Sequence, residues 1–416
     1  MEQNHSKSLV APSNSGALEK VGSGPKRILS LMMTDALVLA RKKERALTQL
    51  RHWIGDQELR EADYRQILNW AEALEMAPEV VLKRLSAAKT HDEKFKIVDC
   101  AIHTLIWDFS KLPILAFNWL SGLRIEVLIF QGHATAEIAP QLPSLKKLWC
   151  WDNHLTELDL TFVPQLTDLW CSDNQLTKLD LTFVPQLMFL WCSHNQMIEL
   201  DLAVVPQLTD LSCSGNALTV LDLAVVPGLT KLDCNNNQLT DLDLAVVPKL
   251  TDLWCSGNAL TQLDLAVVPG LVGLCCAYNQ LTELDLAFVP QLTWLSCRNN
   301  QLTRLDLTFV PQLTELTCGD NALTKLDLAF VPQLTELRCH GNRLNVLDLA
   351  FVPQLTELRC SINNLTELDL PNVPALTILD CRLNRLTELD MTNSKQLSGF
   401  NIDASVKLKK LPSQQF

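Results

Sequence analysis

The sequence predicts a solenoid of short parallel β-strands preceded by a small α-helical domain, so the fold class of the whole chain is α+β. Two observations predict the solenoid. Twelve cysteines recur every 21 residues from Cys150 to Cys381, and an asparagine follows each of them by three residues, from Asn153 to Asn384. A fixed period of this length is typical of an array in which each unit buries its apolar face only against its neighbours.

Each unit has two halves with nearly the same pattern. The first regular unit, residues 145–165, reads LKKLWCWDNH and then LTELDLTFVPQ. The pattern LxxLxCxxNxL followed by LTxLDLxxVPQ resembles the nested bacterial class of leucine-rich repeats sometimes called IRREKO, whose units combine ten and eleven residues. The resemblance covers about residues 124–408. It implies a parallel sheet on the concave face, short strands on the convex face, and an Asn that hydrogen-bonds the backbone of the adjoining turn.

Composition divides the chain into four segments. Residues 1–26 are rich in Ser, Asn and Gly, and we expect them to be disordered. Residues 27–123 are expected to form an α-helical domain, and residues 124–408 the solenoid, with twelve regular repeats at 145–396 and degenerate units at both ends. Residues 409–416 form a short basic tail.

The helical prediction for the N-terminal domain depends on apolar spacing in segments such as ADYRQILNWAEAL and DEKFKIVDCAIHTLIWDF. It suggests about four helices. Thr34-Asp35 and Asp56 are the expected helix starts, and Pro78 and Pro113 the expected boundaries. The expected core residues are Trp70, Leu82, Leu85, Ile97, Ile102, Leu105 and Trp107.

Charge and hydropathy exclude several classes of protein. The net charge of −12 divides into +3 for residues 1–124 and −15 for the rest. An acidic array disfavours nucleic acid, whose phosphates need basic surface. There is no apolar run of about 18 residues that would insert in a membrane, and the N-terminus has no apolar segment of a secretory signal peptide. We expect a monomer, either cytoplasmic or secreted into a host cell without a Sec signal.

The ladder cysteines are expected to be buried thiols in a reducing compartment, because they alternate with exposed positions in the LxC strand. Parallel side chains on neighbouring strands disfavour disulfides. Zinc is disfavoured because the sequence has no CxxC motif or Cys/His pair, and we expect no metal and no other cofactor. Cys100, outside the array, is expected in an apolar helix.

An Asp follows each ladder Asn by six residues, from Asp159 to Asp390. Like charges about 4.8 Å apart repel, which predicts raised pKa values for this Asp column. Backbone hydrogen bonds or the hydroxyls of Thr156 and its equivalents are an alternative compensation. Cation binding is another, although the chain lacks the Gly-rich loops that calcium-binding repeats use.

Sequence variation concentrates at the outward positions of the LxC strands. The N-terminal third of the predicted sheet carries an aromatic stripe, and the C-terminal third carries an acidic column beside an arginine column. Because Trp and Arg dominate interface energetics, we predict that ten of these residues contact a partner. They are Trp149, Trp151, Trp170, Phe189, Trp191, Trp254, Trp294, Arg298, Arg338 and Arg359. The alternative for the aromatic stripe is that the N-terminal domain covers it or that its stacked rings only stabilise the sheet. The alternative for the charged columns is that their residues pair with one another across strands.

These features favour a non-catalytic protein-interaction scaffold or signalling adaptor. The layout resembles type III-secreted leucine-rich-repeat effectors of bacteria, in a form without a ligase domain. The alternative is a surface adhesin or carbohydrate-binding protein, because Trp side chains stack on sugar rings. An enzyme within residues 28–123 is disfavoured, since its titratable residues match no known catalytic spacing. Those residues are His52, Asp56, His91, Asp92 and His103.

Overall fold

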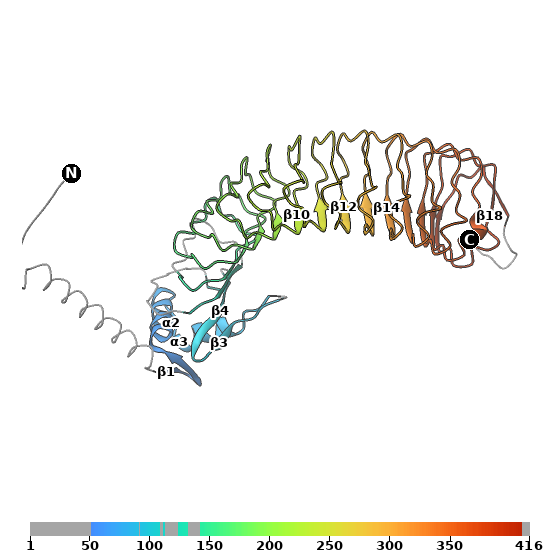
Figure 1. The fold of residues 1–416 in the computed structure, drawn as a ribbon. Coiled ribbons are helices and arrows are strands. Elements are labelled where there is room, and N and C mark those ends of the chain that lie inside the picture. Colours follow the sequence, from blue (N-terminus) through green and yellow to red (C-terminus); the bar gives the residue numbers. More distant parts are fainter. Residues whose placement is uncertain (1–50, 91, 109–110, 113–123, 132–141, 410–416) are drawn as a thin grey trace, which may run out of the picture.

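The computed structural model describes residues 51–90, 92–108, 111–112, 124–131 and 142–409, most of which form a curved solenoid (Figure 1). A 16-stranded sheet runs along the inner side of the arc, and all its strand pairs are parallel except β3–β4. Its strands are β3 (Lys96–Val98), β4 (Ala101–Asp108), β5 (Val127–Gln131), β6 (Lys147–Trp149), β7 (Asp168–Trp170), β8 (Phe189–Trp191), β9 (Asp210–Ser212), β10 (Lys231–Asp233), β11 (Asp252–Trp254), β12 (Gly273–Cys275), β13 (Trp294–Ser296), β14 (Glu315–Thr317), β15 (Glu336–Arg338), β16 (Glu357–Arg359), β17 (Ile378–Asp380) and β19 (Gly399–Asn401).

The pairing register places equivalent residues of successive repeats side by side. Leu148 pairs with Leu169, and Leu169 with Leu190, so each strand position becomes a column along the sheet. The central Leu of each repeat strand is buried, while its two neighbours point to the sheet surface. The sequence differences between repeats therefore appear on this surface.

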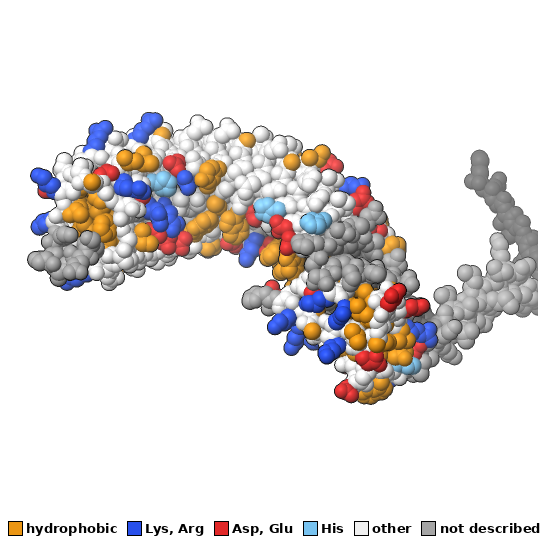
Figure 2. All heavy atoms as spheres, turned by 180° about the vertical axis from the view of Figure 1, so that it is seen from behind, with side chains coloured by type: hydrophobic (Ala, Val, Ile, Leu, Met, Phe, Trp, Pro, Cys, Tyr) orange, Lys and Arg blue, Asp and Glu red, His pale blue; other side chains and the backbone are white. Residues whose placement is uncertain are grey.

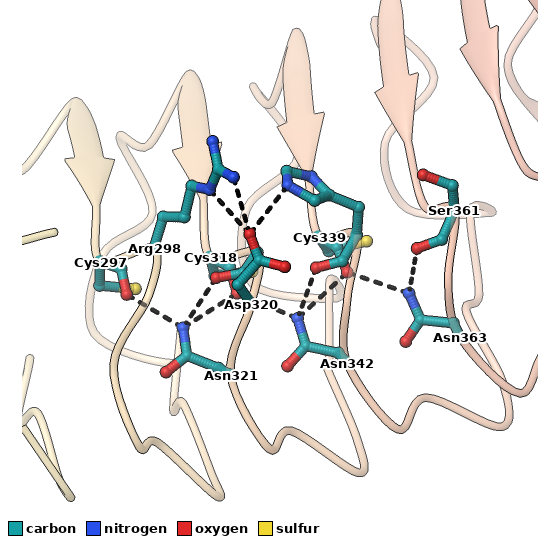
Figure 3. Close-up of polar contacts among 11 residues, drawn as sticks. Cys297, Arg298, Cys318, Asp320, Asn321, Cys339, Asn342, Ser361 and Asn363 are labelled. Atoms are coloured by element: carbon teal, nitrogen blue, oxygen red, sulfur yellow. Dashed lines mark hydrogen bonds and ion pairs between the residues drawn. The ribbon is translucent and has the colours of Figure 1, made fainter. Parts of the chain in front are cut away.

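A ladder of asparagine side chains joins each repeat to the one before it. Nδ2 of Asn174 donates to the carbonyl oxygens of Cys150, Cys171 and Ser172 at 2.9–3.1 Å, and its Oδ1 accepts from the backbone N–H of Leu155 at 3.0 Å. The same bonds recur along the array, for example at Asn321 and Asn342 (Figure 3). These bonds satisfy backbone groups that would otherwise be buried without partners.

The ladder cysteines fill the core beside the leucines. All twelve are free thiols and at most 1 % exposed, which confirms the predicted burial. Burial raises the pKa of the thiols, to about 12 for Cys171 and Cys297. Their thiolate population at neutral pH is therefore negligible, and they act as small apolar side chains.

The N-terminal unit packs on the first long strand of the same sheet. It contains a hairpin, β1 (Arg51–Ile54) and β2 (Gln57–Arg60), followed by helices α2 (Glu61–Ala73) and α3 (Pro78–Ser86). The rings of Trp70 in α2 and Trp107 in β4 meet edge to face at 5.0 Å. The indole of Trp107 also donates to the carbonyl oxygen of Leu112 at 2.9 Å. The core of this unit is thus continuous with that of the solenoid.

Several sequence predictions for this unit are wrong. Residues 96–108 form the β3–β4 hairpin instead of a helix, and Asp56 lies in the turn between β1 and β2 instead of starting a helix. Cys100 is half-buried in the β3–β4 turn, where it and Asp99 have positive φ angles. The error has a physical reason: β4 is covered on both faces, and such a strand is a continuous apolar run that periodicity cannot distinguish from a helix.

Other predictions for this unit hold. Pro78 begins α3, and the expected core residues are buried except Ile97, which is half-buried. Thr34, Asp35 and Pro113 lie outside the described residues. The predicted boundary at residue 124 does not interrupt the sheet, because β4 pairs directly with β5.

The outer half of the repeats consists mainly of turns. Within the described residues, the strands found there are β18 (Glu388–Asp390) and its partner β20 (Lys407–Lys409), and a 3₁₀ turn spans Leu370–Asn372. The expectation of short strands on this half is therefore wrong for most repeats. Neighbouring outer segments share one regular backbone bond, such as Gln175 N–H to the Leu155 carbonyl oxygen at 2.8 Å, and one bond does not form a ladder.

The Asp column lies on this outer half, and its carboxylates hold the turns. Oδ1 of Asp306 accepts from the Thr308 backbone N–H at 3.0 Å and from its hydroxyl at 2.6 Å. The Thr hydroxyl and then the backbone bond lower the pKa of Asp180 and Asp306. Lys409 and Thr392 lower that of Asp390. The predicted rise is wrong at these three positions because the hydrogen bonds lower the pKa by more than burial raises it. The Thr residues involved are not equivalents of Thr156.

The buried Asp63 predicts a pH-dependent stability. Its carboxylate in α2 accepts from the Ile102 N–H at 3.0 Å, and burial raises its pKa to about 6. Because the folded pKa exceeds the unfolded value, stability should fall as pH rises from about 4 to about 6, by up to about 3 kcal/mol. Asp63→Asn should remove this fall in urea unfolding measured between pH 4 and 8. Parallel profiles for the two proteins would contradict this role of Asp63.

Candidate partner-binding surface

The aromatic stripe is a stack of parallel indole rings across β6, β7 and β8. The ring centroids of Trp149 and Trp170 are 4.2 Å apart, and those of Trp170 and Trp191 are 4.4 Å apart, with interplanar angles of 8°. Trp151 is tilted beside both Trp149 and Trp170, at 6.0 and 6.1 Å. The spacing follows from the register, since the three stacked rings share one column of the sheet.

The N-terminal end of the stack is buried. Trp149 is only 4 % exposed and packs with Ala88, two residues after α3, and with Ile106, Val127 and Ile129 of β4 and β5. Trp151 and Trp170 are half-buried against the same cluster. The prediction that Trp149 faces solvent is therefore wrong, and the alternative is confirmed at this ring, because the N-terminal unit covers one side of it and Trp170 stacks on the other.

The indole nitrogens separate the stack into two parts. Nε1 of Trp149 and Nε1 of Trp170 are buried and have no hydrogen-bond partner among the described residues. The indole of Trp191, in contrast, donates to Oδ1 of Asp210 at 3.0 Å. Unpaired buried donors lower stability, so the first two rings contribute through packing alone.

The exposed end of the stack lies on β8. Phe189 and Trp191 are 37 % and 38 % exposed and occupy the two outward positions of this strand. The column continues past Trp191 into the smaller Ser212, which leaves that side of the ring uncovered by another aromatic residue. Trp254 on β11 and Trp294 on β13 are half-buried on the same sheet surface. These four aromatic residues remain available as contact residues.

Beyond the aromatic region the sheet surface carries ion pairs. Arg298 contacts Oδ2 of Asp320 through two nitrogens at 2.8 and 2.9 Å, and His340 Nε2 lies 3.3 Å from the same oxygen (Figure 3). Arg338 bonds Glu336 and Glu357, and Arg359 bonds Glu357. The Arg338 bond lowers the pKa of Glu357, and Glu357 raises that of Arg338. The three predicted arginines are thus neutralised within the sheet, as the pairing alternative proposed.

The described residues contain no helix that is long and apolar enough to cross a lipid bilayer, and no group of three or more side chains arranged to hold a metal ion. A hollow of about 810 Å³ on the outer half is lined by Asp243, Asp264, Asp285 and Asp306 among others.

Sequence reasoning missed three exposed apolar residues in the turns that follow the strands. Tyr278, Ile362 and Leu383 each lie two residues after a ladder cysteine and are 53 %, 52 % and 65 % exposed. In most repeats this position holds Gly, Asn or Asp. That departure from turn-forming residues was the signal in the sequence.

The fold and its surface define a leucine-rich-repeat solenoid. The family model described as leucine-rich repeats in two copies matches residues 143–183 and 227–267. Comparison with curated proteins found no match.

Solved structures share the architecture. The functional domain of InlJ from Listeria monocytogenes, which includes a cysteine ladder, is 37 % identical, with a TM-score of 0.62, covering 65 % of this chain and 60 % of that one. The chain therefore spans less than two thirds of the InlJ chain. YopM, a leucine-rich effector protein from Yersinia pestis, is 29 % identical, with a TM-score of 0.54, covering 66 % and 85 %. An internalin from Listeria monocytogenes is 22 % identical, with a TM-score of 0.57, covering 66 % and 82 %.

The two ends of the Trp stack should respond differently to truncation. Trp149→Ala should lower the free energy of unfolding by about 3–5 kcal/mol, because it empties a buried site. Trp191→Ala should cost about 1 kcal/mol, because the ring is partly exposed and loses one stacking contact. Urea unfolding followed by circular dichroism measures both. Equal losses for the two variants would contradict the division of the stack into a buried and an exposed part.

Proposed function

We propose that this protein is a non-catalytic scaffold that binds a protein partner on the surface of its large sheet, around Phe189 and Trp191. The observation that carries the proposal is the exposed end of the Trp stack. The two side chains stand on one strand, and the ring of Trp191 is held by its stacking on Trp170. Rigid aromatic residues bury a large area at small entropic cost, which makes them effective anchors.

The surroundings of this anchor suit a protein partner. Trp254 and Trp294 extend the apolar surface along the same sheet, and Asp210 and Asp233 provide acidic groups beside it. The ring faces of Trp149 and Trp170 are hidden in the stack, so a sugar would find few free faces on which to pack. The arrangement therefore favours a polypeptide over the carbohydrate alternative.

An effector role fits one of the similar structures. YopM is a leucine-rich effector protein. We propose an effector-like role in which the solenoid recruits or sequesters its partner, in the bacterial cytoplasm or in a host cell. The partner contacts Phe189, Trp191, Trp254 and Trp294, while the paired Arg298, Arg338 and Arg359 contribute a polar rim.

Capture of a partner tests this proposal. The immobilised full chain is incubated with bacterial lysate and, separately, with host-cell lysate, and retained proteins are quantified by mass spectrometry. Phe189→Ser with Trp191→Ser should reduce capture of the specific partner by at least about tenfold, since each side chain contributes one to several kcal/mol.

The matched control is Val220→Ser, because Val220 is 72 % exposed and lies on the outer half of its repeat. It should retain the partner fully. Undiminished capture by the Phe189/Trp191 variant would remove the sheet surface as the binding site. If the full chain retains glycans instead of proteins, and the Phe189/Trp191 variant no longer retains them, the result would favour the carbohydrate alternative.

A further inference from the structure

The turn after every repeat strand requires a left-handed backbone conformation. The residue two positions after each ladder cysteine has a φ angle between 51° and 66° in all twelve regular repeats. Gly, Asn and Asp adopt this conformation most readily, and eight of the twelve positions hold one of them. Every repeat needs this turn conformation. A residue at this position that adopts it poorly therefore indicates that the position has a second role.

Ile362 and Leu383 occupy this position in adjacent repeats, and both have φ angles of 56°. A β-branched side chain such as Ile is sterically disfavoured in this region of backbone conformation. Burial does not compensate, because Ile362 is 52 % and Leu383 is 65 % exposed. Both residues therefore lower the stability of their turns and expose apolar surface to water. Residues that do both are expected where a partner is bound.

Arginines surround this apolar pair. Arg343 and Arg385 each lie two residues after the left-handed position of their repeats, are exposed, and have no ion pair among the described residues. Arg382 precedes Leu383 and is held by two bonds to Asp380 at 2.9 and 3.0 Å. At the C-terminal end of the array, on the left in Figure 2, Lys and Arg side chains gather around hydrophobic ones.

The same combination recurs elsewhere in the array. Tyr278 also occupies the left-handed position, with a φ angle of 53°, and is 53 % exposed. The guanidinium of Arg298 lies 5.6 Å from its ring centroid. At both places the backbone N–H of the apolar residue donates to the carbonyl oxygen of an arginine in the next repeat, from Tyr278 to Arg298 and from Ile362 to Arg382. At Leu383 the same N–H instead donates to Oδ2 of Asp403 at 2.7 Å, and Arg382 is its neighbour in the chain.

We propose that Ile362 and Leu383, flanked by Arg343, Arg382 and Arg385, form a second docking surface, which binds an acidic protein segment that carries apolar side chains. The apolar pair contacts the apolar part of the segment, and Arg343 and Arg385 receive its carboxylates, while Arg382 stays bonded to Asp380. This surface lies in the turns, separate from Phe189 and Trp191, and does not depend on the function proposed above. An anionic membrane is disfavoured because an extended lipid surface would also face the rest of the array, which carries a charge of −15, whereas a short segment contacts the patch alone.

A selection from a displayed library of random 12-residue peptides on the immobilised full chain tests this assignment. Enriched peptides should combine Asp or Glu with Leu, Ile or Phe. Synthetic copies of these peptides should bind the double variant Ile362→Asn/Leu383→Asn at least about tenfold more weakly than the natural sequence. The double variant Arg343→Gln/Arg385→Gln should also bind them more weakly. Val346→Asn is the matched control, because Val346 is 57 % exposed outside the patch, and it should bind like the natural sequence.

Stability separates loss of binding from loss of fold. Asn adopts the left-handed conformation at Asn236 and Asn299, so the Ile362→Asn/Leu383→Asn variant should unfold at a urea midpoint equal to or above that of the natural sequence. Enrichment of peptides without acidic residues, or equal binding by this variant, would overturn the proposal. The proposal would also be overturned, in favour of a lipid surface, if no peptide is enriched and the natural sequence binds phosphatidylglycerol vesicles while this variant does not.

Discussion

The architecture depends on the asparagine in each repeat. Its amide nitrogen reaches carbonyl oxygens of its own repeat and of the preceding one, while its oxygen accepts from the backbone of the preceding repeat. A repeat of this kind cannot bury its core alone, so the contacts between neighbours determine stability. The Asn bonds fix both the distance and the register of those contacts, because they satisfy backbone groups inside the turn that no strand partner reaches.

The fixed register determines what the surface can do. Equivalent strand positions form straight columns, so three Trp residues in successive repeats must stack, and Glu336 and Glu357 must lie beside Arg338 and Arg359. The stack is buried at one end by the N-terminal unit and open at Trp191. Binding residues are thereby placed on a stiff support, which reduces the entropic cost of capturing a partner.

The repeat array was largely predictable because its period is long and unbroken. The buried cysteines and the outward columns follow from alternation along the LxC strand, and the inward Asn follows from the resemblance to leucine-rich repeats. Coverage of the aromatic stripe by the N-terminal unit was an open alternative from the sequence, but nothing in the residues near Trp149 indicates that Ala88 and Ile106 are the ones that cover it. The β3–β4 hairpin was mistaken for a helix because both faces of β4 are buried. The Asp column departs from the expected rise in pKa because Asp180 and Asp306 accept local hydrogen bonds from Thr182 and Thr308, which the spacing of the charges does not show.

The central claim is that the Asn ladder holds the columns in register, and Asn174→Ala tests it most directly, because Asn174 joins the repeats that carry Trp149 and Trp170. Urea unfolding and the circular dichroism of the stacked indoles are measured on the same protein. The account predicts a loss of about 3 kcal/mol, from several buried backbone groups left unpaired, together with a weaker signal from the Trp stack. A variant that retains both the stability, within about 0.5 kcal/mol, and the stacking signal would contradict it.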